Sequence, residues 1–291
     1  MGLKPPSFFG TRNLSVCEIT ERSGAVLASA LSSNPSSLKE LDLTGNHLGD
    51  TGVKKLSAVH EDPSCKQEKL WLPDCRFSDQ GCSALASALC SNPSTPTELY
   101  LSCSHQGDTG VTKLSAVLKD PSCKLDKLQL SVCGIREQSC AALASALCSN
   151  HSSLIELDLS YNHLGDTGLK KLSAGLKDPS CKLEKLLLSE CGITEQGCTI
   201  LASALFSNPS SLKELNLRGN HLGDTGVTKL SAGLKDPNCK LEKLLSYRRN
   251  HLPPPRSYRR NHHWPPPPRS YRRNHRQPRG EVRSSDAPAH M

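Results

Sequence analysis

The chain has 291 residues, 14 cysteines and a formal net charge of +8. The basic excess lies in residues 246–291, where eleven arginines stand against Glu281 and Asp286, a net charge of +9; residues 1–245, with 25 basic and 26 acidic residues, have a net charge of −1. No apolar run reaches the length of a signal peptide or a membrane span, so we expect a cytoplasmic protein with reduced thiols and no membrane association.

The sequence repeats itself about every 29 residues from Phe9 to Leu245. Each repeat follows the pattern L-x-x-L-x-L-x-x-N/C, as in LKELDLTGN. Two kinds of repeat alternate, so near-identical sequence returns in every second repeat, about 58 residues further on. Seven full repeats lie between a partial first repeat and the beginning of a ninth. Their leucine pairs are Leu41/Leu43, Leu70/Leu72, Leu99/Leu101, Leu128/Leu130, Leu157/Leu159, Leu186/Leu188 and Leu215/Leu217.

In chain order, each repeat predicts a short strand, a turn and a helix. Leu-x-Leu has the period of two that is typical of a strand with one buried face. A turn with glycine follows, and Asp166-Thr167 in one kind of repeat and Thr194-Glu195 in the other resemble helix starts. Apolar residues then recur at helical spacing until an Asp-Pro or Asn-Pro pair, such as Asp178-Pro179, ends the helix. Because one repeat alone cannot bury both elements, we predict a stacked solenoid with strands inside and helices outside.

The alternating patterns LxxLxLxxN…LGDxG and LxxLxLxxC…ITxxGC resemble the leucine-rich repeats of ribonuclease inhibitor and of NOD-like (NACHT–LRR) receptors. The resemblance covers about residues 9–245, after an N-terminal extension of residues 1–8. It implies an α/β horseshoe with a parallel β-sheet on the concave face and helices on the convex face. The connectors SNPSSLKELDL and KDPSCKLEKL favour the receptor group, which implies a module that binds a protein partner or a foreign ligand in innate immune signalling. The sequence contains no NACHT module, so we expect no nucleotide switching.

Catalytic motifs of the types GxxxxGK[ST], GxSxG and HExxH are absent from the sequence, so we predict no enzymatic activity, cofactor or metal. Four His–Asp pairs look like metal ligands, but they recur at one register, two strands or roughly 10 Å apart. One metal ion cannot bridge that distance. We expect each aspartate to cap a helix N-terminus and each histidine to lie in a solvated turn. The pairs are His47/Asp50, His105/Asp108, His163/Asp166 and His221/Asp224.

The cysteines also follow the repeat. One row of cysteines occupies the position that asparagine holds in the other kind of repeat, no CxxC occurs, and like positions lie too far apart for disulfides. We expect the asparagine amide to satisfy backbone groups at the strand ends, with cysteine as a small buried substitute. Cys103 lies off register and is the thiol to test for reactivity. The two rows are Cys17, Cys75, Cys133 and Cys191, and Asn46, Asn162 and Asn220.

The residue before each core leucine alternates in charge along the repeats. Opposite charges would therefore lie side by side on neighbouring strands, each pair contributing about 0.2–1 kcal/mol. A ligand-reading surface is the alternative, but such regularity favours strand alignment. The residues are Glu40, Lys69, Glu98, Lys127, Glu156, Lys185, Glu214 and Lys243.

The positions that differ between repeats are the candidates for recognition. Two rows vary: the concave-facing residue between the paired leucines, and the residue three further along. A scaffold gives no reason for such variation, whereas a recognition surface does; neutral drift at solvated sites is the alternative. Trp71 and Tyr100 fall on adjacent strands, about 5 Å apart, and exposed aromatic residues are favoured binding anchors. The predicted protein-binding residues are Trp71, Tyr100, Asp158, Tyr161, Leu187 and Glu190.

Departures from the pattern cluster between residues 60 and 106. His60, Gln67, Pro96 and Gln106 stand where other repeats have leucine, and each loses buried apolar area worth up to ~1.5–3 kcal/mol. We predict that this segment opens first in hydrogen exchange, because it has the least apolar burial. Uniform protection along the array would contradict this prediction.

Residues 246–291 form an Arg/Pro-rich tail with three SYRRNH copies, which predicts disorder. Its arginine, tyrosine and histidine residues could hold RNA or another polyanion weakly. Translation of tandem-repeat DNA after loss of the repeat frame is the alternative explanation. Three functions therefore stay open: a recognition module of the NOD-like-receptor type, a ribonuclease inhibitor-like protein, and a nucleic-acid binder that acts through the tail.

Overall fold

The computed structural model describes residues 10–33, 38–92, 96–104, 107–149, 151–206, 211–235 and 239–246. All of these residues belong to one compact unit, Met1–Leu252. The predicted extension 1–8, and the predicted tail apart from Ser246, lie outside the described residues.

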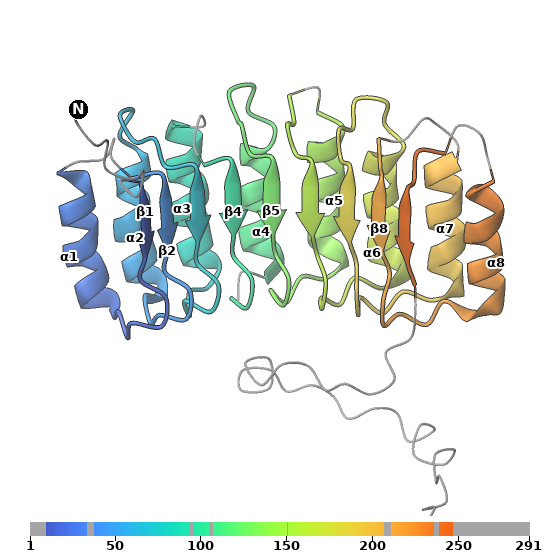
Figure 1. Cartoon of the computed structure of the whole chain (residues 1–291), viewed down its shortest axis with the longest axis horizontal. Helices are drawn as coiled ribbons and strands as arrows, with labels where there is room; N and C mark the ends of the chain where they lie inside the picture. The colour runs from blue at the N-terminus through green and yellow to red at the C-terminus, as the bar shows by residue number, and fades with distance from the viewer. Residues whose placement is uncertain are drawn as a thin grey trace, which may run out of the picture. The chain divides into compact units, whose positions relative to one another are not determined.

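Strands and helices alternate along the described residues, and each of the first eight strands is followed by a helix (Figure 1). The strands lie side by side in chain order as one parallel sheet, with the helices in a second layer. The strands are β1 (Thr11–Asn13), β2 (Glu40–Asp42), β3 (Lys69–Trp71), β4 (Glu98–Tyr100), β5 (Lys127–Gln129), β6 (Glu156–Asp158), β7 (Lys185–Leu187), β8 (Glu214–Asn216) and β9 (Lys243–Leu245). The helices are α1 (Glu21–Ser32), α2 (Gly49–His60), α3 (Asp79–Ser91), α4 (Gly107–Val117), α5 (Glu137–Leu147), α6 (Gly165–Leu176), α7 (Glu195–Phe206) and α8 (Gly223–Gly233). This arrangement confirms the predicted leucine-rich-repeat solenoid.

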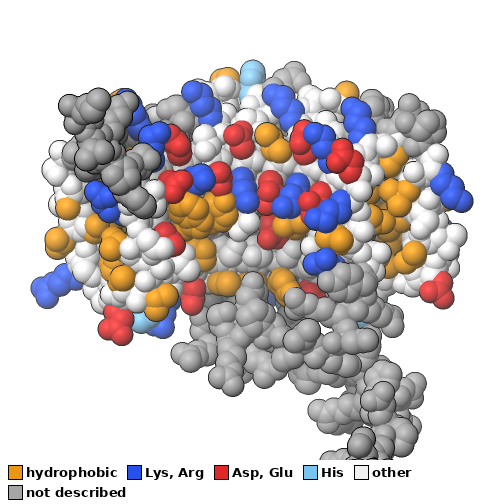
Figure 2. Space-filling view, viewed as in Figure 1, with side chains coloured by type: hydrophobic (Ala, Val, Ile, Leu, Met, Phe, Trp, Pro, Cys, Tyr) orange, Lys and Arg blue, Asp and Glu red, His pale blue; other side chains and the backbone are white. Residues whose placement is uncertain are grey.

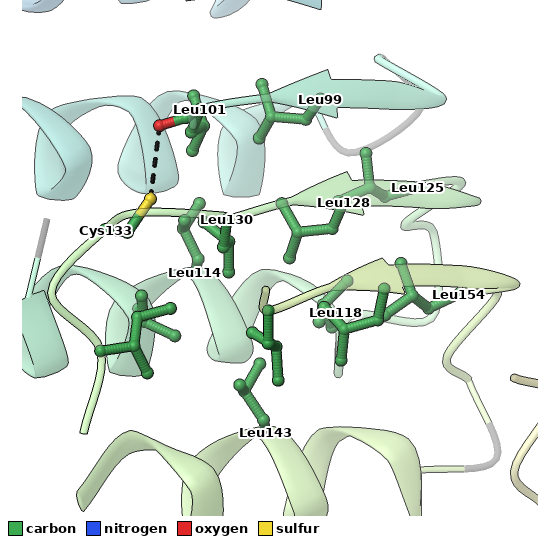
Figure 3. Close-up of a cluster of buried hydrophobic side chains, with 14 of the residues drawn as sticks. Leu99, Leu101, Leu114, Leu118, Leu125, Leu128, Leu130, Cys133, Leu143 and Leu154 are labelled. Atoms are coloured by element: carbon green, nitrogen blue, oxygen red, sulfur yellow. Dashed lines mark hydrogen bonds between the residues drawn. The ribbon is translucent and has the colours of Figure 1, made fainter. Parts of the chain in front are cut away.

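The hydrophobic core fills the space between the sheet and the helices. The paired leucines Leu128 and Leu130 are fully buried, and they pack with leucines from neighbouring strands and from α4 and α5 (Figure 3). Each core leucine lies beside its counterpart in the next repeat, as Leu99 lies beside Leu128. The core is therefore continuous along the array, and each repeat depends on its neighbours for burial.

Buried asparagines bond each repeat of their kind to the repeat before it. Asn162 Oδ1 accepts hydrogen bonds from the backbone N–H groups of Cys133 and Ile135, both at 3.0 Å. Its Nδ2 donates to the carbonyl oxygens of Leu130 and Leu159 at 2.8 and 2.9 Å. Asn46 and Asn220 make the same four bonds in their own repeats. The predicted role of the asparagine row is thus confirmed.

Three aspartates of the His–Asp pairs, Asp50, Asp108 and Asp166, cap helices, but they cap the helix of the following repeat and not their own. Asp50 lies in the first turn of α2, and its Oδ1 accepts from the N–H groups of Ser78 and Gly81 at the start of α3, at 2.7 and 2.8 Å. Asp108 and Asp166 accept in the same way from N–H groups at the starts of α5 and α7. A negative charge at a helix N-terminus is stabilising whichever repeat supplies it.

The irregular segment holds polar side chains inside the core. His60 and Gln67 are 2% and 1% exposed, and a cavity of about 10 Å³, room for about one water, lies beside them. Ser104 occupies the asparagine register; it is fully buried, and its Oγ has no hydrogen-bond partner among the described residues. Pro96 is buried as its leucine counterparts are, whereas Gln106 lies outside the described residues.

Candidate functional site

The open face of the sheet, turned away from the helices, carries the residues on either side of the first paired leucine. In β2 to β8 the central leucine is buried and both of its neighbours are half-buried. Because side chains alternate along a strand, those two neighbours share one face, which is the concave face of the solenoid. The charged row and the first variable row therefore form a single surface.

The alternating charged row forms ion pairs across the strands, as predicted (Figure 2). Lys69 Nζ lies 3.4 Å from Glu40 and 3.5 Å from Glu98, and Lys185 Nζ lies 3.5 Å from Glu156. Further pairs join Lys127 to Glu156 at 3.2 Å and Lys243 to Glu214 at 2.9 Å. These charges satisfy one another, so they align the strands more than they offer free charge to a ligand.

Trp71 and Tyr100 form a stacked aromatic pair on this face. Their ring centroids lie 5.1 Å apart with an interplanar angle of 17°, because Trp71 pairs with Tyr100 in the β3–β4 register. Figure 2 shows a hydrophobic patch below the charged row in this part of the sheet. Lys127 Nζ lies 5.3 Å from the Tyr100 centroid, a cation–π contact that sequence reasoning missed.

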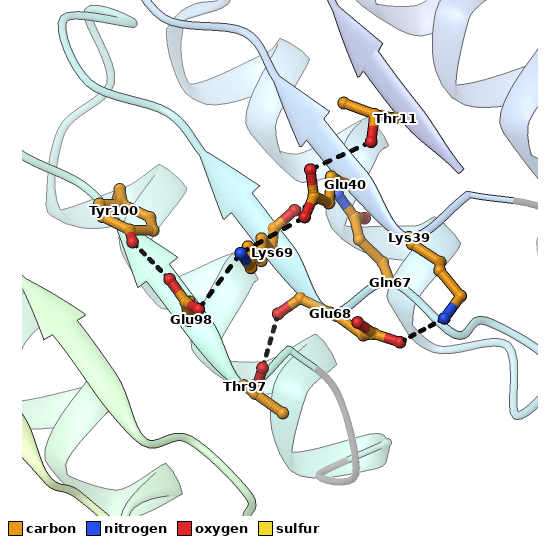
Figure 4. A network of polar contacts seen from close by, with 9 residues as sticks. All are labelled: Thr11, Lys39, Glu40, Gln67, Glu68, Lys69, Thr97, Glu98 and Tyr100. Atoms are coloured by element: carbon orange, nitrogen blue, oxygen red, sulfur yellow. Dashed lines mark hydrogen bonds and ion pairs between the residues drawn. The ribbon is translucent and has the colours of Figure 1, made fainter. Parts of the chain in front are cut away.

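A chain of polar contacts holds the tyrosine in place (Figure 4). The Tyr100 hydroxyl donates to Glu98, Glu98 pairs with Lys69, and Lys69 pairs with Glu40. The Thr11 hydroxyl donates to Glu40 at 3.1 Å, so this series of polar contacts spans four strands, β1 to β4. Burial, followed by the hydrogen bond to Glu98, raises the pKa of Tyr100, so its hydroxyl stays protonated and acts as a donor.

Asp158 and Leu187 are paired in the β6–β7 register, apart from the aromatic pair, with β5 between the two groups. Asp158 Oδ1 accepts from the N–H of Ser160 at 2.8 Å, and Asp42 and Asn216 make the same turn contact with the residue two positions on. The variation at Asp158 therefore has a structural explanation that we did not predict. Burial raises the pKa of the Asp158 carboxyl.

The second variable row shares one backbone conformation. Every residue in the row has a positive φ, including Tyr161 and Glu190 at 59° and 53°. Gly45 and Gly219 occupy the same row, and glycine takes this conformation without strain. This conformation gives a structural reason for the two glycines of the row, and a role for Tyr161 and Glu190 in binding stays a prediction. The other members are Val16, Asp74, Cys103 and Val132.

The described histidines of the His–Asp pairs lie in exposed turns. His47, His163 and His221 are exposed in their turns, while His105 lies outside the described residues. The described residues contain no group of three or more His, Cys, Asp or Glu side chains that could hold a metal ion, and no helix among them is both long and apolar enough to cross a membrane. Burial raises the pKa of the Cys75 thiol to about 12, which disfavours the reactive thiolate.

Cysteines in the asparagine register bond to the preceding repeat through sulfur. Cys75 and Cys191 are fully buried, and their Sγ atoms donate to the carbonyl oxygens of Leu43 and Leu159 at 3.0 and 3.2 Å. They therefore act as the predicted small buried substitutes, whereas Cys17 is exposed at the first repeat.

Comparisons with known proteins identify the repeats. The family described as "Leucine Rich repeat" matches residues 34–57, 150–173 and 208–231. NACHT, LRR and PYD domains-containing protein 12 of Homo sapiens is 43% identical over 228 residues, which cover 78% of this chain and 21% of that protein. Ribonuclease inhibitor of Sus scrofa is 42% identical over 228 residues, which cover 78% of this chain and 49% of the inhibitor. The chain thus spans about a fifth of the first relative and about half of the second.

Among solved structures, the crystal structure of the TLR13-ssRNA13 complex is similar over 75% of this chain and 34% of that chain, with a TM-score of 0.44 and 18% sequence identity. The chain carries a leucine-rich-repeat array of the ribonuclease inhibitor type, the type also found in NACHT, LRR and PYD domains-containing proteins.

Proposed function

We propose that this chain is a recognition module that binds a protein partner or a foreign ligand on its concave face, in cytoplasmic innate immune signalling of the NOD-like-receptor type. The observation that carries the proposal is the stacked Trp71–Tyr100 pair, half-buried and braced by Glu98 and Lys127, beside an alternating charged row that forms ion pairs. A preorganised aromatic anchor loses little conformational entropy on binding. Asp158, Leu187, Tyr161 and Glu190 would contribute as a second group of contacts.

Replacing both Trp71 and Tyr100 with alanine is expected to weaken partner binding by at least about thirtyfold, the effect of losing a hot spot worth ~2 kcal/mol. The partner would be obtained by proximity labelling of the intact chain, and its affinity measured with purified proteins. The matched control is Gln80→Ala with Gln196→Ala, which truncates two exposed side chains in the first turns of α3 and α7, away from the open face of the sheet. An unchanged affinity in the aromatic variant, at an unchanged melting temperature, would remove the aromatic pair from the binding surface.

A ribonuclease inhibitor-like function is the second candidate, supported by the 42% identity to that inhibitor. It is tested by titrating the chain into a pancreatic-type ribonuclease and measuring RNA cleavage. Inhibition that is lost in the Trp71/Tyr100 double variant would replace the receptor-type proposal. Full ribonuclease activity at saturating chain would eliminate this candidate.

Nucleic-acid binding through residues 246–291 is the third function, and it rests on the charge of +9 in that segment. Deleting 246–291 would abolish RNA retention if the tail carries the function. It would leave protein binding intact if the concave face does.

A further inference from the structure

The aromatic stack has one occupied end and one open end. The Tyr100 ring lies between Trp71 on the β3 side and the Lys127 ammonium on the β5 side. Because β2, β3 and β4 are consecutive in the sheet, the second face of the Trp71 ring is turned toward β2. Among the described residues, no lysine or arginine lies over that second face.

A carboxylate lies beside the open end. Asp42 is the register partner of Trp71 on β2, and its Oδ1 accepts from the N–H of Thr44 at 2.9 Å. Asp42 takes part in none of the ion pairs of the described residues, whereas its neighbour Glu40 is paired with Lys69 at 3.4 Å. Uncompensated negative charge therefore borders an aromatic face that carries no cation.

We infer that the space above Asp42, against the outer face of Trp71, receives a cationic side chain of the protein partner, and that arginine fits it best. This inference rests on the proposed function of the concave face. The Trp71 ring attracts a cation through its π-electrons, and the Asp42 carboxylate attracts the same cation through charge. A guanidinium is planar, stacks on aromatic rings and pairs with carboxylates, whereas an ammonium cannot stack.

The spacing of the sheet suits such a stack. Neighbouring strands lie about 4.8 Å apart, and the Trp71–Tyr100 separation of 5.1 Å shows that flat groups stack at this interval. Aspartate is much shorter than tryptophan, so the space beside the indole is not filled by the Asp42 side chain. A guanidinium there would continue the order of the stack, with a cation at each end. A nucleic acid fits this place poorly, because its phosphates would approach Asp42 and Glu40.

The test uses the whole chain with Trp264→Phe, which leaves Trp71 as the one tryptophan of the two in the sequence. The probe is N-acetyl-arginine amide, and the neutral isostere is N-acetyl-citrulline amide, both at constant ionic strength. Trp71 fluorescence and its indole N–H resonance report occupancy. We expect saturable shifts with the arginine probe and at least about tenfold weaker binding of the citrulline probe, since only the former is a cation.

Asp42→Asn is the decisive variant, expected to weaken arginine binding by about three- to tenfold. The turn should survive, because Asn13 and Asn216 hold this register and accept the same bond from the residues two positions on, at 3.0 and 3.1 Å. The matched control is Asp120→Asn in the turn after α4, a carboxylate that likewise accepts from the N–H two positions on, at 2.9 Å, and lies outside the concave face. The control variant should bind the arginine probe as the parent chain does.

Three results would overturn the inference: equal binding of the arginine and citrulline probes, no effect of Asp42→Asn, or preferential binding of adenosine monophosphate. If the arginine probe fails while the Trp71/Tyr100 variant still loses its protein partner, the concave-face proposal stands and the cation site alone is rejected. If both experiments fail, both are rejected.

Discussion

Replacing Asn162 with serine is expected to lower the free energy of unfolding by about 3–5 kcal/mol. Asn162 is 1% exposed, and its amide is the partner of two backbone N–H groups and two carbonyl oxygens. Serine is too short to reach all four, and each buried backbone group left without a partner costs about 1–3 kcal/mol. The change is measured by urea unfolding at neutral pH, with hydrogen exchange to locate the loss around α5 and α6.

The chain provides the reciprocal variant at Ser104, which stands where the asparagine would be. By register, an asparagine at 104 would direct its amide oxygen at the N–H groups of Cys75 and Phe77, as Asn46 does at Cys17 and Ile19. Ser104→Asn is expected to raise the free energy of unfolding by about 1–3 kcal/mol, since it would also remove a buried hydroxyl that lacks a partner among the described residues. No change in either variant would contradict a stabilising role for the asparagine row.

Between pH 6.5 and pH 4 the parent chain is expected to lose about 3 kcal/mol of its free energy of unfolding through His60, and replacing His60 with leucine should remove this loss. His60 is buried in α2, and burial lowers its pKa from 6.5 to about 4. In the unfolded chain the imidazole titrates near 6.5, so between pH 6.5 and 4 the unfolded state binds more protons than the folded state. Stability due to this group is therefore full above pH 6.5 and falls as the pH drops toward 4, by about 1.4 kcal/mol for each unit of difference between the two pKa values.

The measurement compares the pH dependence of urea unfolding between the parent and His60→Leu. Leucine occupies the same register in Leu118 and Leu176, both buried, so the variant should also be more stable at pH 7, by about 1–2 kcal/mol. Carboxylates that lose stabilising contacts below pH 4 affect both proteins equally and cancel in the difference. The control is Leu176→Val in the same register of α6, which lowers stability without a titratable group and should therefore leave the pH profile parallel to that of the parent. Parallel profiles for the parent and His60→Leu would contradict the assignment.

The fold could be predicted almost completely from the leucines, because Leu-x-Leu at a constant spacing determines strand, face and register together. The alternation of Glu40, Lys69 and Glu98 likewise predicted which strands are neighbours, and the ion pairs confirm it. Such features follow from residue type and spacing alone.

Three features could not be predicted, because they depend on backbone geometry or on contacts between repeats. Asp50 lies in the first turn of one helix yet caps the next, a contact that the order of residues along one repeat does not indicate. Tyr161 and Glu190 are predicted binding residues because their row varies between repeats. The positive φ shared by the row explains why two of its members are glycines. No structural reason for an aspartate at position 158 is apparent in the sequence, but the hydrogen bond that its carboxylate accepts from the Ser160 N–H supplies one.

Within the candidate site, sequence placed Trp71 and Tyr100 together but could not give the ring orientation or the position of Lys127. Both depend on side-chain rotamers, which are determined by packing against neighbouring side chains on the concave face. Asp42, the residue most important to the inferred cation site, is not among the predicted binding residues, because sequence alone does not show which carboxylates form ion pairs.

The asparagine and aspartate contacts also bear on how such a chain can grow. In the repeat that contains Asn46 and Asp50, Asn46 bonds to the preceding repeat and Asp50 bonds to the following one. The two neighbouring repeats supply the backbone N–H groups that these side chains accept from. Loss of a single repeat would place two repeats of one kind in contact. Asparagine side-chain amides or backbone N–H groups at the junction would then lack hydrogen-bond partners. Loss or duplication of two together would restore every contact. With these contacts, an array is expected to change length by two repeats at a time.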